Sequence, residues 1–117
     1  MCGLLCAPCA RAATPPPNPV IPAIWQADAI CETGRNPPIW DYGKRGRAGY
    51  GGSYEGGIAF AASTWHAWHR FVPAARRYDH AYDAPADVQW RVAQYGLDHY
   101  GRWGCLFHTS VWRLHRP

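Results

Sequence analysis

The sequence has few charged residues, among them only two glutamates and one lysine, and it lacks any long apolar run. No stretch approaches the roughly 20 apolar residues needed to cross a bilayer, so we do not expect an integral membrane protein. Only 17% of the 117 residues are charged, and all basic residues except Lys44 are arginines. The formal charge of +4 favours an anionic partner such as nucleic acid, a membrane surface or a bacterial wall.

The arginines are scattered along the chain and form no stripe, so we do not expect nucleic-acid binding. Aromatic residues, by contrast, make up 15% of the chain and include seven tryptophans. A single small core cannot bury all of them, so some are expected to line a binding surface.

The first 22 residues do not read as part of a folded domain. Residues 1–12 contain a short apolar stretch and an Ala-x-Ala end but no positively charged beginning, which indicates either a degenerate secretory signal or an unstructured tail. Residues 13–22 are too rich in proline for a helix interior and predict a semi-rigid tether. We therefore expect a signal or tether at 1–22, one domain at 23–106 and a tail at 107–117.

A first helix is expected after Pro22, because proline is tolerated in an opening turn, and its natural stop is Gly34. Its core-facing stripe is predicted to comprise Ile24, Ala27 and Cys31. Glu32 lies beside that stripe at the end of the helix. The partial negative charge at a helix C-terminus disfavours an ionised carboxylate, so this position favours the protonated acid.

Residues 35–57 are rich in glycine, proline and tyrosine and predict little regular structure, with a loop or short hairpin that walls a cleft. A second helix is expected over 64–71, with Ser63 as its cap. Its tryptophans, Trp65 and Trp68, lie on one side and are expected in the core.

The clearest helix pattern covers residues 85–100, where Asp83 is the expected cap and Gly101 the stop. Its apolar stripe is Val88, Val92 and Tyr95. Together these elements predict an α+β fold that is mainly α.

The cysteines and histidines do not predict a metal site. Cys6 and Cys9 have C-x-x-C spacing but no second pair, and His66 and His69 lack a third ligand. No cofactor is expected.

Four segments carry a resemblance to a known family. They are Ile-Cys-Glu-Thr-Gly-Arg-Asn at 30–36, Tyr-Glu-Gly-Gly-Ile-Ala-Phe at 54–60, Ser-Thr-Trp at 63–65 and Trp-Gly-Cys at 103–105. In this order and spacing the chain resembles the transglycosylase-like domains of resuscitation-promoting factors and related actinobacterial and phage cell-wall lysins. The resemblance covers about residues 24–105 and implies a small lysozyme-like domain.

The resemblance implies that Glu32 is the catalytic acid and that Cys31 and Cys105 form a disulfide. Such a crosslink closes a long loop, stabilises a small domain by about 4 kcal/mol on the chain-entropy model, and belongs in an oxidising compartment. The implied substrate is peptidoglycan, and we expect a monomer that is secreted, bound to the cell wall, or encoded by a phage and delivered to the wall.

Cleavage of a glycosidic bond needs an acid that is still protonated near neutral pH. Our hypothesis is that Glu32 protonates the oxygen leaving N-acetylmuramic acid and then removes the proton from the 6-hydroxyl of that sugar, which gives a 1,6-anhydro end. If Glu55 or Asp41 instead positions a water molecule, the protein is a lysozyme-type hydrolase. A binding module without catalysis is the third alternative.

Sugar contacts are expected from the loops and the aromatic residues, since ring faces pack against pyranose faces while polar groups bind their edges. The candidates are Thr33, Trp40, Tyr54, Gly56, Gly57 and Trp65. Ala59 stands where many members of the resembled family have glutamine, which removes one expected sugar contact.

Overall fold

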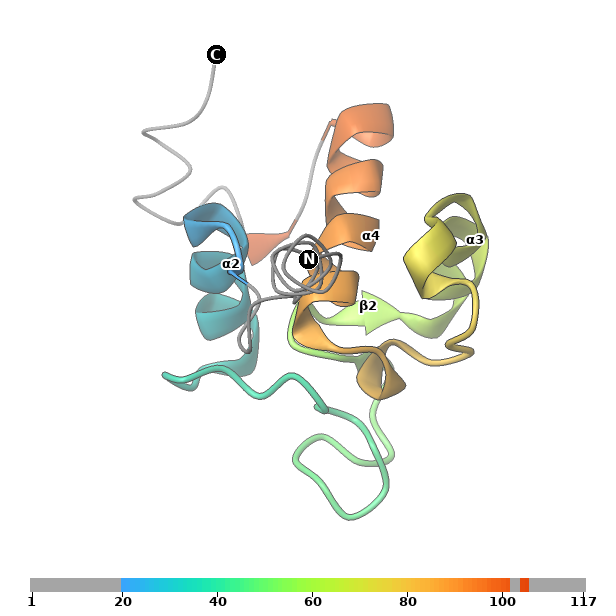
Figure 1. The fold of residues 1–117 in the computed structure, drawn as a ribbon. Helices are drawn as coiled ribbons and strands as arrows, with labels where there is room; N and C mark the ends of the chain where they lie inside the picture. Colours follow the sequence, from blue (N-terminus) through green and yellow to red (C-terminus); the bar gives the residue numbers. More distant parts are fainter. Residues whose placement is uncertain (1–19, 102–103, 106–117) are drawn as a thin grey trace, which may run out of the picture.

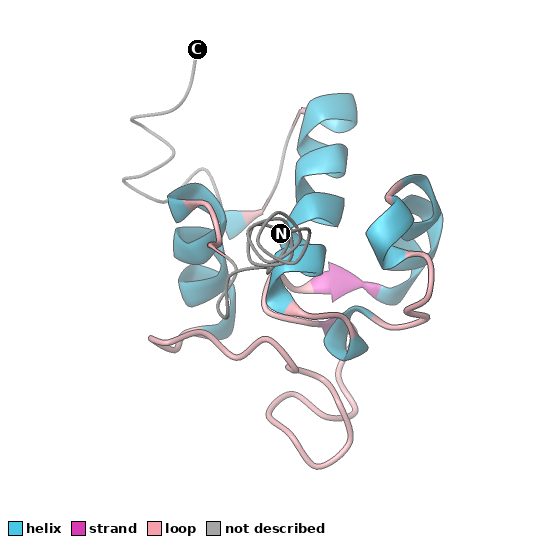
Figure 2. Cartoon of the chain, in the orientation of Figure 1, coloured by secondary structure: helices cyan, strands magenta, loops and turns pink. Residues whose placement is uncertain are grey.

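The computed structural model describes residues 20–101 and 104–105. In that part of the chain it contains three α-helices and one two-stranded antiparallel sheet, with short 3-10 turns between them. The expected α+β, mainly α, fold class is confirmed (Figure 2). The C-terminal tail and all but residues 20–22 of the expected tether lie outside the described residues, as do Cys2, Cys6, Cys9 and Trp103. None of the helices described is long and apolar enough to cross a membrane.

Helix α2 spans Ala23–Thr33, and Gly34 ends it with a left-handed φ of 65°, as predicted. The predicted core stripe was wrong: Ile24 and Ala27 are only half-buried, and Cys31 is exposed. The residues that α2 buries are Trp25, Asp28 and Ala29. The buried face is centred on Trp25, whose ring has more apolar surface to remove from water than Ile24 has, and Ile24 packs at the edge of the core.

The sheet is a hairpin of β1, Tyr54–Glu55, and β2, Phe60–Ala61. Tyr54 pairs with Ala61 and Glu55 with Phe60. Residues 35–53, which precede the hairpin, form only turns and loops, as the glycine and proline content predicts. Of the two alternatives expected, a loop or a short hairpin, the structure has the hairpin, but at residues 54–61 and so partly beyond the predicted 35–57 region.

Helix α3, Ala62–Trp68, follows β2 directly and continues as the 3-10 turn η1, His69–Phe71. The predicted start was wrong, because Ser63 lies inside the first helical turn and Ala61 is the N-cap. Ala61 already has the extended backbone of a cap as the last residue of β2, with φ −63° and ψ 142°, so the helix starts without a side-chain cap.

After the 3-10 turns η2, Pro73–Ala75, and η3, Ala81–Asp83, helix α4 spans Ala86–Tyr100. Gly101 ends it with φ 78°, as predicted. Asp83 was expected to cap α4, but the N-cap is Pro85. The Asp83 carboxylate instead forms a salt bridge of 2.9 Å with Lys44, on the loop before the hairpin.

The core lies where all of these elements meet, and its largest fully buried apolar side chains are Trp25, Ile58, Phe60, Trp65 and Val92. In Figure 1, α4 lies between α2 on one side and α3 on the other, with the hairpin beneath. A disulfide joins Cys31 at the end of α2 to Cys105, with 6.0 Å between the two Cα atoms. The end of α2 is thereby fixed to the segment that follows α4.

Candidate active site

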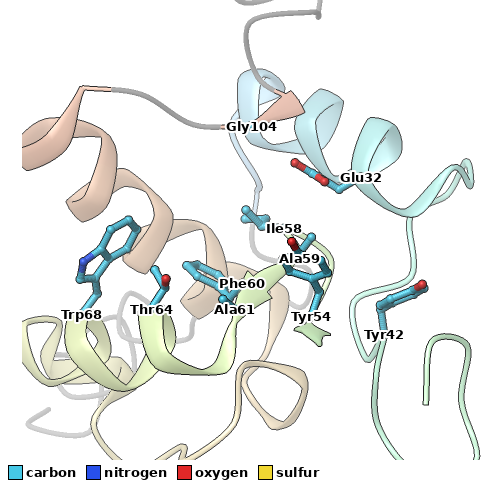
Figure 3. Close-up of a pocket in the computed structure, with 10 residues that line it drawn as sticks. All are labelled: Glu32, Tyr42, Tyr54, Ile58, Ala59, Phe60, Ala61, Thr64, Trp68 and Gly104. Carbon is cyan, nitrogen blue, oxygen red and sulfur yellow. The ribbon is translucent and has the colours of Figure 1, made fainter. Parts of the chain in front are cut away.

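A cleft of about 600 Å³ opens between the end of α2, the hairpin and α3 (Figure 3). Its volume is within the usual range for small-molecule and saccharide sites. Its walls combine aromatic and aliphatic side chains with polar groups in nearly equal share. The residues that line it are Glu32, Tyr42, Tyr54, Ile58, Ala59, Phe60, Ala61, Thr64, Trp68 and Gly104.

Glu32 provides the one carboxylate among the described residues that line this cleft. The backbone N–H of Cys105 donates a hydrogen bond of 3.0 Å to its Oε1, and no described residue bonds Oε2. Gly104 allows this approach, because a Cβ atom at that position would lie 2.9 Å from Oε1. The disulfide one residue before Glu32 and the Cys105 amide therefore hold the carboxyl group at the cleft wall from both ends of the crosslink.

The hairpin forms the opposite wall, to which Tyr54 and residues 58–61 contribute. Tyr54 lines the cleft with 55% of its surface exposed, whereas the next residue, Glu55, is 7% exposed on the other face. Ala59, in the turn, also lines the cleft and has a left-handed φ of 55°, a conformation that disfavours alanine. The hairpin thus presents the methyl group of Ala59, whose backbone is strained, and the ring of Tyr54 to the space in front of Glu32 (Figure 3).

Gln89 of α4 holds the hairpin turn from behind. Its side chain is fully buried, its Oε1 accepts a 2.9 Å bond from the Gly57 N–H, and its Nε2 donates to the carbonyls of Trp40 and Ala84. Gly56 must be glycine because a Cβ atom there would overlap the Gln89 amide, and a Cβ atom at Gly57 would lie 2.6 Å from the Trp40 ring. The glycine pair therefore permits this packing and contributes no wall to the cleft.

Glu55 lies on the reverse face of the hairpin and does not line the cleft. Its Oε1 is 2.7 Å from Nδ1 of His80, and its buried Oε2 has no hydrogen-bond partner among the described residues. Tyr82 stacks on His80, and partial burial, followed by the negative charges of Glu55 and Asp83, raises the pKa of the Tyr82 hydroxyl. This position corrects the expectation that Glu55 is a candidate for a second carboxylate in the site.

Asp41, the other candidate, does not line the cleft either. Its carboxylate forms a 2.9 Å salt bridge with Arg47 on the exposed loop. Both candidates for a water-positioning acid are therefore absent from the cleft wall as the structure describes it.

Of the six residues expected to bind sugar, only Tyr54 lines the cleft. Trp65 is 0% exposed, and its indole N–H donates to the Tyr78 carbonyl, so its ring is a core element and cannot contact a substrate. Trp40 packs on Gly57. The Thr33 hydroxyl donates to the Ala29 carbonyl and accepts from the Ile39 N–H, which turns the loop after α2.

Four polar or aromatic wall residues were not among the expected ones: Tyr42, Phe60, Thr64 and Trp68. The sequence placed Trp68 in the core with Trp65, since both lie on one side of a short helix. No local sequence signal separates them: in the structure Trp65 is fully buried, whereas Trp68, the last residue of α3, packs against the edge of the core.

Metal ligands do not gather in the described ranges, which contain no group of three His, Cys, Asp or Glu side chains placed to hold an ion. His66 and His69 have their rings 6.0 Å apart, and His69 Nδ1 lies 3.2 Å from the Ala75 carbonyl.

No protein-family model matches the chain, and no curated protein and no solved structure matches it at a significant level. Function therefore has to be inferred from the cleft geometry together with the sequence motifs.

Proposed function

We propose that this protein cleaves the glycan strands of peptidoglycan between N-acetylmuramic acid and N-acetylglucosamine, as a lytic transglycosylase with Glu32 as its acid and then its base. The observation that carries the proposal is a cleft with aromatic walls in which Glu32 is the one carboxylate among the described lining residues. It agrees with the resemblance to resuscitation-promoting factors, in which the residue after the first cysteine is the catalytic glutamate.

In the proposed reaction Glu32 gives its proton to the glycosidic oxygen, and the bond from that oxygen to C1 of the muramic acid breaks. The developing positive charge at C1 is relieved when the 6-hydroxyl oxygen of the same sugar bonds to it. Glu32, now a carboxylate, takes the hydroxyl proton, so the enzyme returns to its starting state. The Cys105 N–H fixes Oε1, which leaves Oε2 for both proton transfers.

A hydrolase would need a group that activates water on the opposite side of the sugar, and in most glycosidases that group is a second carboxylate. Glu55 and Asp41 are engaged with His80 and Arg47, away from the cleft. This distribution supports the intramolecular route over hydrolysis. The disulfide supports a site of action outside the cytoplasm, at the cell wall.

The test is to compare Glu32→Gln with Glu55→Gln, which makes the same chemical change at a glutamate outside the cleft. Glu32→Gln should slow lysis of purified cell walls by about 10²- to 10⁴-fold, the usual contribution of a general acid, while cosedimentation with the walls is retained. Glu55→Gln should lyse walls at close to the wild-type rate. Unchanged lysis by Glu32→Gln would refute the assignment, and walls that are bound but not lysed by the wild type would indicate a binding module.

A further inference from the structure

The disulfide and the proposed acid lie at the same point of the fold. Cys31 is exposed to solvent, and Glu32 is the next residue of α2. Cys105, the other half of the bridge, donates its backbone N–H to Oε1 of Glu32 over 3.0 Å. The crosslink therefore ties to α2 the residue that supplies the hydrogen-bond donor of the acid, from 73 positions further along the chain.

Gly104 belongs to the same arrangement. It lines the cleft next to Glu32, and a Cβ atom at this position would lie 2.9 Å from Oε1 (Figure 3). The pair 104–105 thus touches the carboxyl group twice, through the Cys105 amide and through the bare Cα of Gly104. The sulfur bridge is the covalent link that keeps this pair at the end of α2.

The position of the carboxyl group decides the rate of the proposed reaction. A general acid acts only within hydrogen-bond reach of the oxygen that it protonates, and a displacement of about 1 Å can cost about 10²-fold in rate. A single hydrogen bond that water can replace contributes little on its own. The crosslink supplies the constraint that the hydrogen bond lacks.

The exposure of Cys31 makes this constraint reversible. A disulfide is reduced by the attack of a thiolate on one of its sulfur atoms, so the rate depends on access to the sulfur. A dithiol that reduces the bridge gives up two electrons and two protons: the bond between the two cysteines breaks, two thiols form, and the dithiol closes into its own disulfide. The link between 104–105 and α2 is then lost.

We propose that the Cys31–Cys105 disulfide controls the proposed catalysis, because it holds Gly104 and the Cys105 N–H against the Glu32 carboxyl group and so positions the acid. The inference rests on the proposed function and adds its regulation. Gly104 and Cys105 are positioning residues. The chain is then inactive where thiols stay reduced, as in a cytoplasm, and active in an oxidising compartment such as the one that contains the wall.

The experiment compares the wild-type protein in its oxidised form, after reduction with dithiothreitol, and after reoxidation. The rate of lysis and cosedimentation are measured with purified cell walls, at a temperature where circular dichroism shows that the reduced protein is folded. We expect reduction to lower the rate at saturating wall concentration by about 10- to 100-fold and to leave cosedimentation unchanged. Reoxidation should restore the rate.

The double variant Cys31→Ser, Cys105→Ser is the matched control for the reductant. It should lyse walls at the rate of the reduced wild type, with or without dithiothreitol. Since it keeps Cys2, Cys6 and Cys9, any effect of the reductant through those residues would appear in it.

Gly104→Ala tests the positioning without a change of redox state. The added Cβ atom meets the end of the flexible Glu32 side chain, and Gly104 has no left-handed φ, so the carboxyl group shifts while the backbone keeps its place. We expect a rate of lysis about tenfold lower, with the disulfide intact and the melting temperature unchanged.

Equal rates for the oxidised and the folded, reduced protein would overturn the inference and leave the proposed catalysis standing. So would a wild-type rate in Gly104→Ala, or a loss on reduction that reoxidation does not restore. Unfolding of the reduced protein at every temperature would replace local positioning by a global loss of structure and overturn it too. Absence of lysis by the oxidised wild type is a different outcome, which refutes the proposed function itself.

Discussion

Glu32 and Glu55 are the two glutamates of the chain, and the structure gives them opposite surroundings. Glu32 is half-buried at the wall of an open cleft and accepts one hydrogen bond from a backbone amide. Glu55 is buried on the reverse face of the hairpin, against His80 and behind the turn that Gln89 holds.

On the proposed function, the difference teaches that burial alone does not identify a catalytic acid. Glu55 is the more deeply buried of the two, but its surroundings are protein on every side that the structure describes except where His80 reaches solvent. Glu32 combines a fixed oxygen with access to a space large enough for a saccharide. Access to a substrate, together with a fixed geometry, is what general acid catalysis requires.

The largest expected effect on stability comes from the crosslink beside Glu32. Replacing both Cys31 and Cys105 with serine should lower the free energy of unfolding by about 4 kcal/mol, because the bridge closes a long loop in the unfolded chain. Urea denaturation measures this, and reduction of the wild-type protein should give the same shift. An unchanged midpoint would show that the crosslink does not hold the cleft side together.

On the reverse face, Gln89→Leu should cost about 3 kcal/mol, because it leaves the Gly57 N–H and the carbonyls of Trp40 and Ala84 without their partner. Gln94→Leu is the matched control on the same helix. Its Oε1 accepts one bond from the Trp25 indole and its Nε2 donates an exposed bond to Asp98, so we expect a loss of about 1 kcal/mol. Equal losses in the two variants would contradict the role of Gln89 in holding the hairpin.

His80→Ala should lower stability by about 2 kcal/mol, because the buried Glu55 carboxylate then has no hydrogen bond to either oxygen. Lysis of cell walls at a temperature where the variant is folded should stay close to wild type. A catalytic loss comparable to that of Glu32→Gln would break the distinction between the two faces.

The smallest effect is expected at Ala59, in the turn between β1 and β2. Ala59→Gly should raise stability by about 0.5 kcal/mol, because glycine adopts a positive φ without strain but loses more entropy on folding. Thermal melting measures the shift. A lower melting temperature would mean that the Ala59 methyl group contributes packing that outweighs the backbone strain.

Much of the fold could be predicted from local signals. Gly34 and Gly101 end helices in the left-handed conformation that glycine adopts most readily, and the glycine-rich run before Ile58 makes the predicted hairpin. Helix starts were less predictable. Ser63 and Asp83 are good caps by chemistry, but the preceding strand and the Lys44 salt bridge take precedence over them.

The site was predicted only in part, because a motif names residues but does not give their directions. Glu32, Tyr54 and the disulfide lie together as expected. Trp65 and Glu55 follow cleft-forming residues in sequence, yet tertiary packing turns them away. A Cβ atom at Gly96 of α4 would overlap the ring of Trp68 at the end of α3, and neither local sequence reveals this close contact between the two helices.

The most direct test of a lone carboxylate that acts as acid and base is a mass spectrum of the muropeptides released from purified peptidoglycan by the wild-type protein. The account predicts fragments that end in 1,6-anhydro-N-acetylmuramic acid, which are absent when Glu32→Gln is used. Fragments with reducing ends would contradict it, since they show that water and not the 6-hydroxyl attacks C1, and the described cleft wall offers no carboxylate besides Glu32 to position that water.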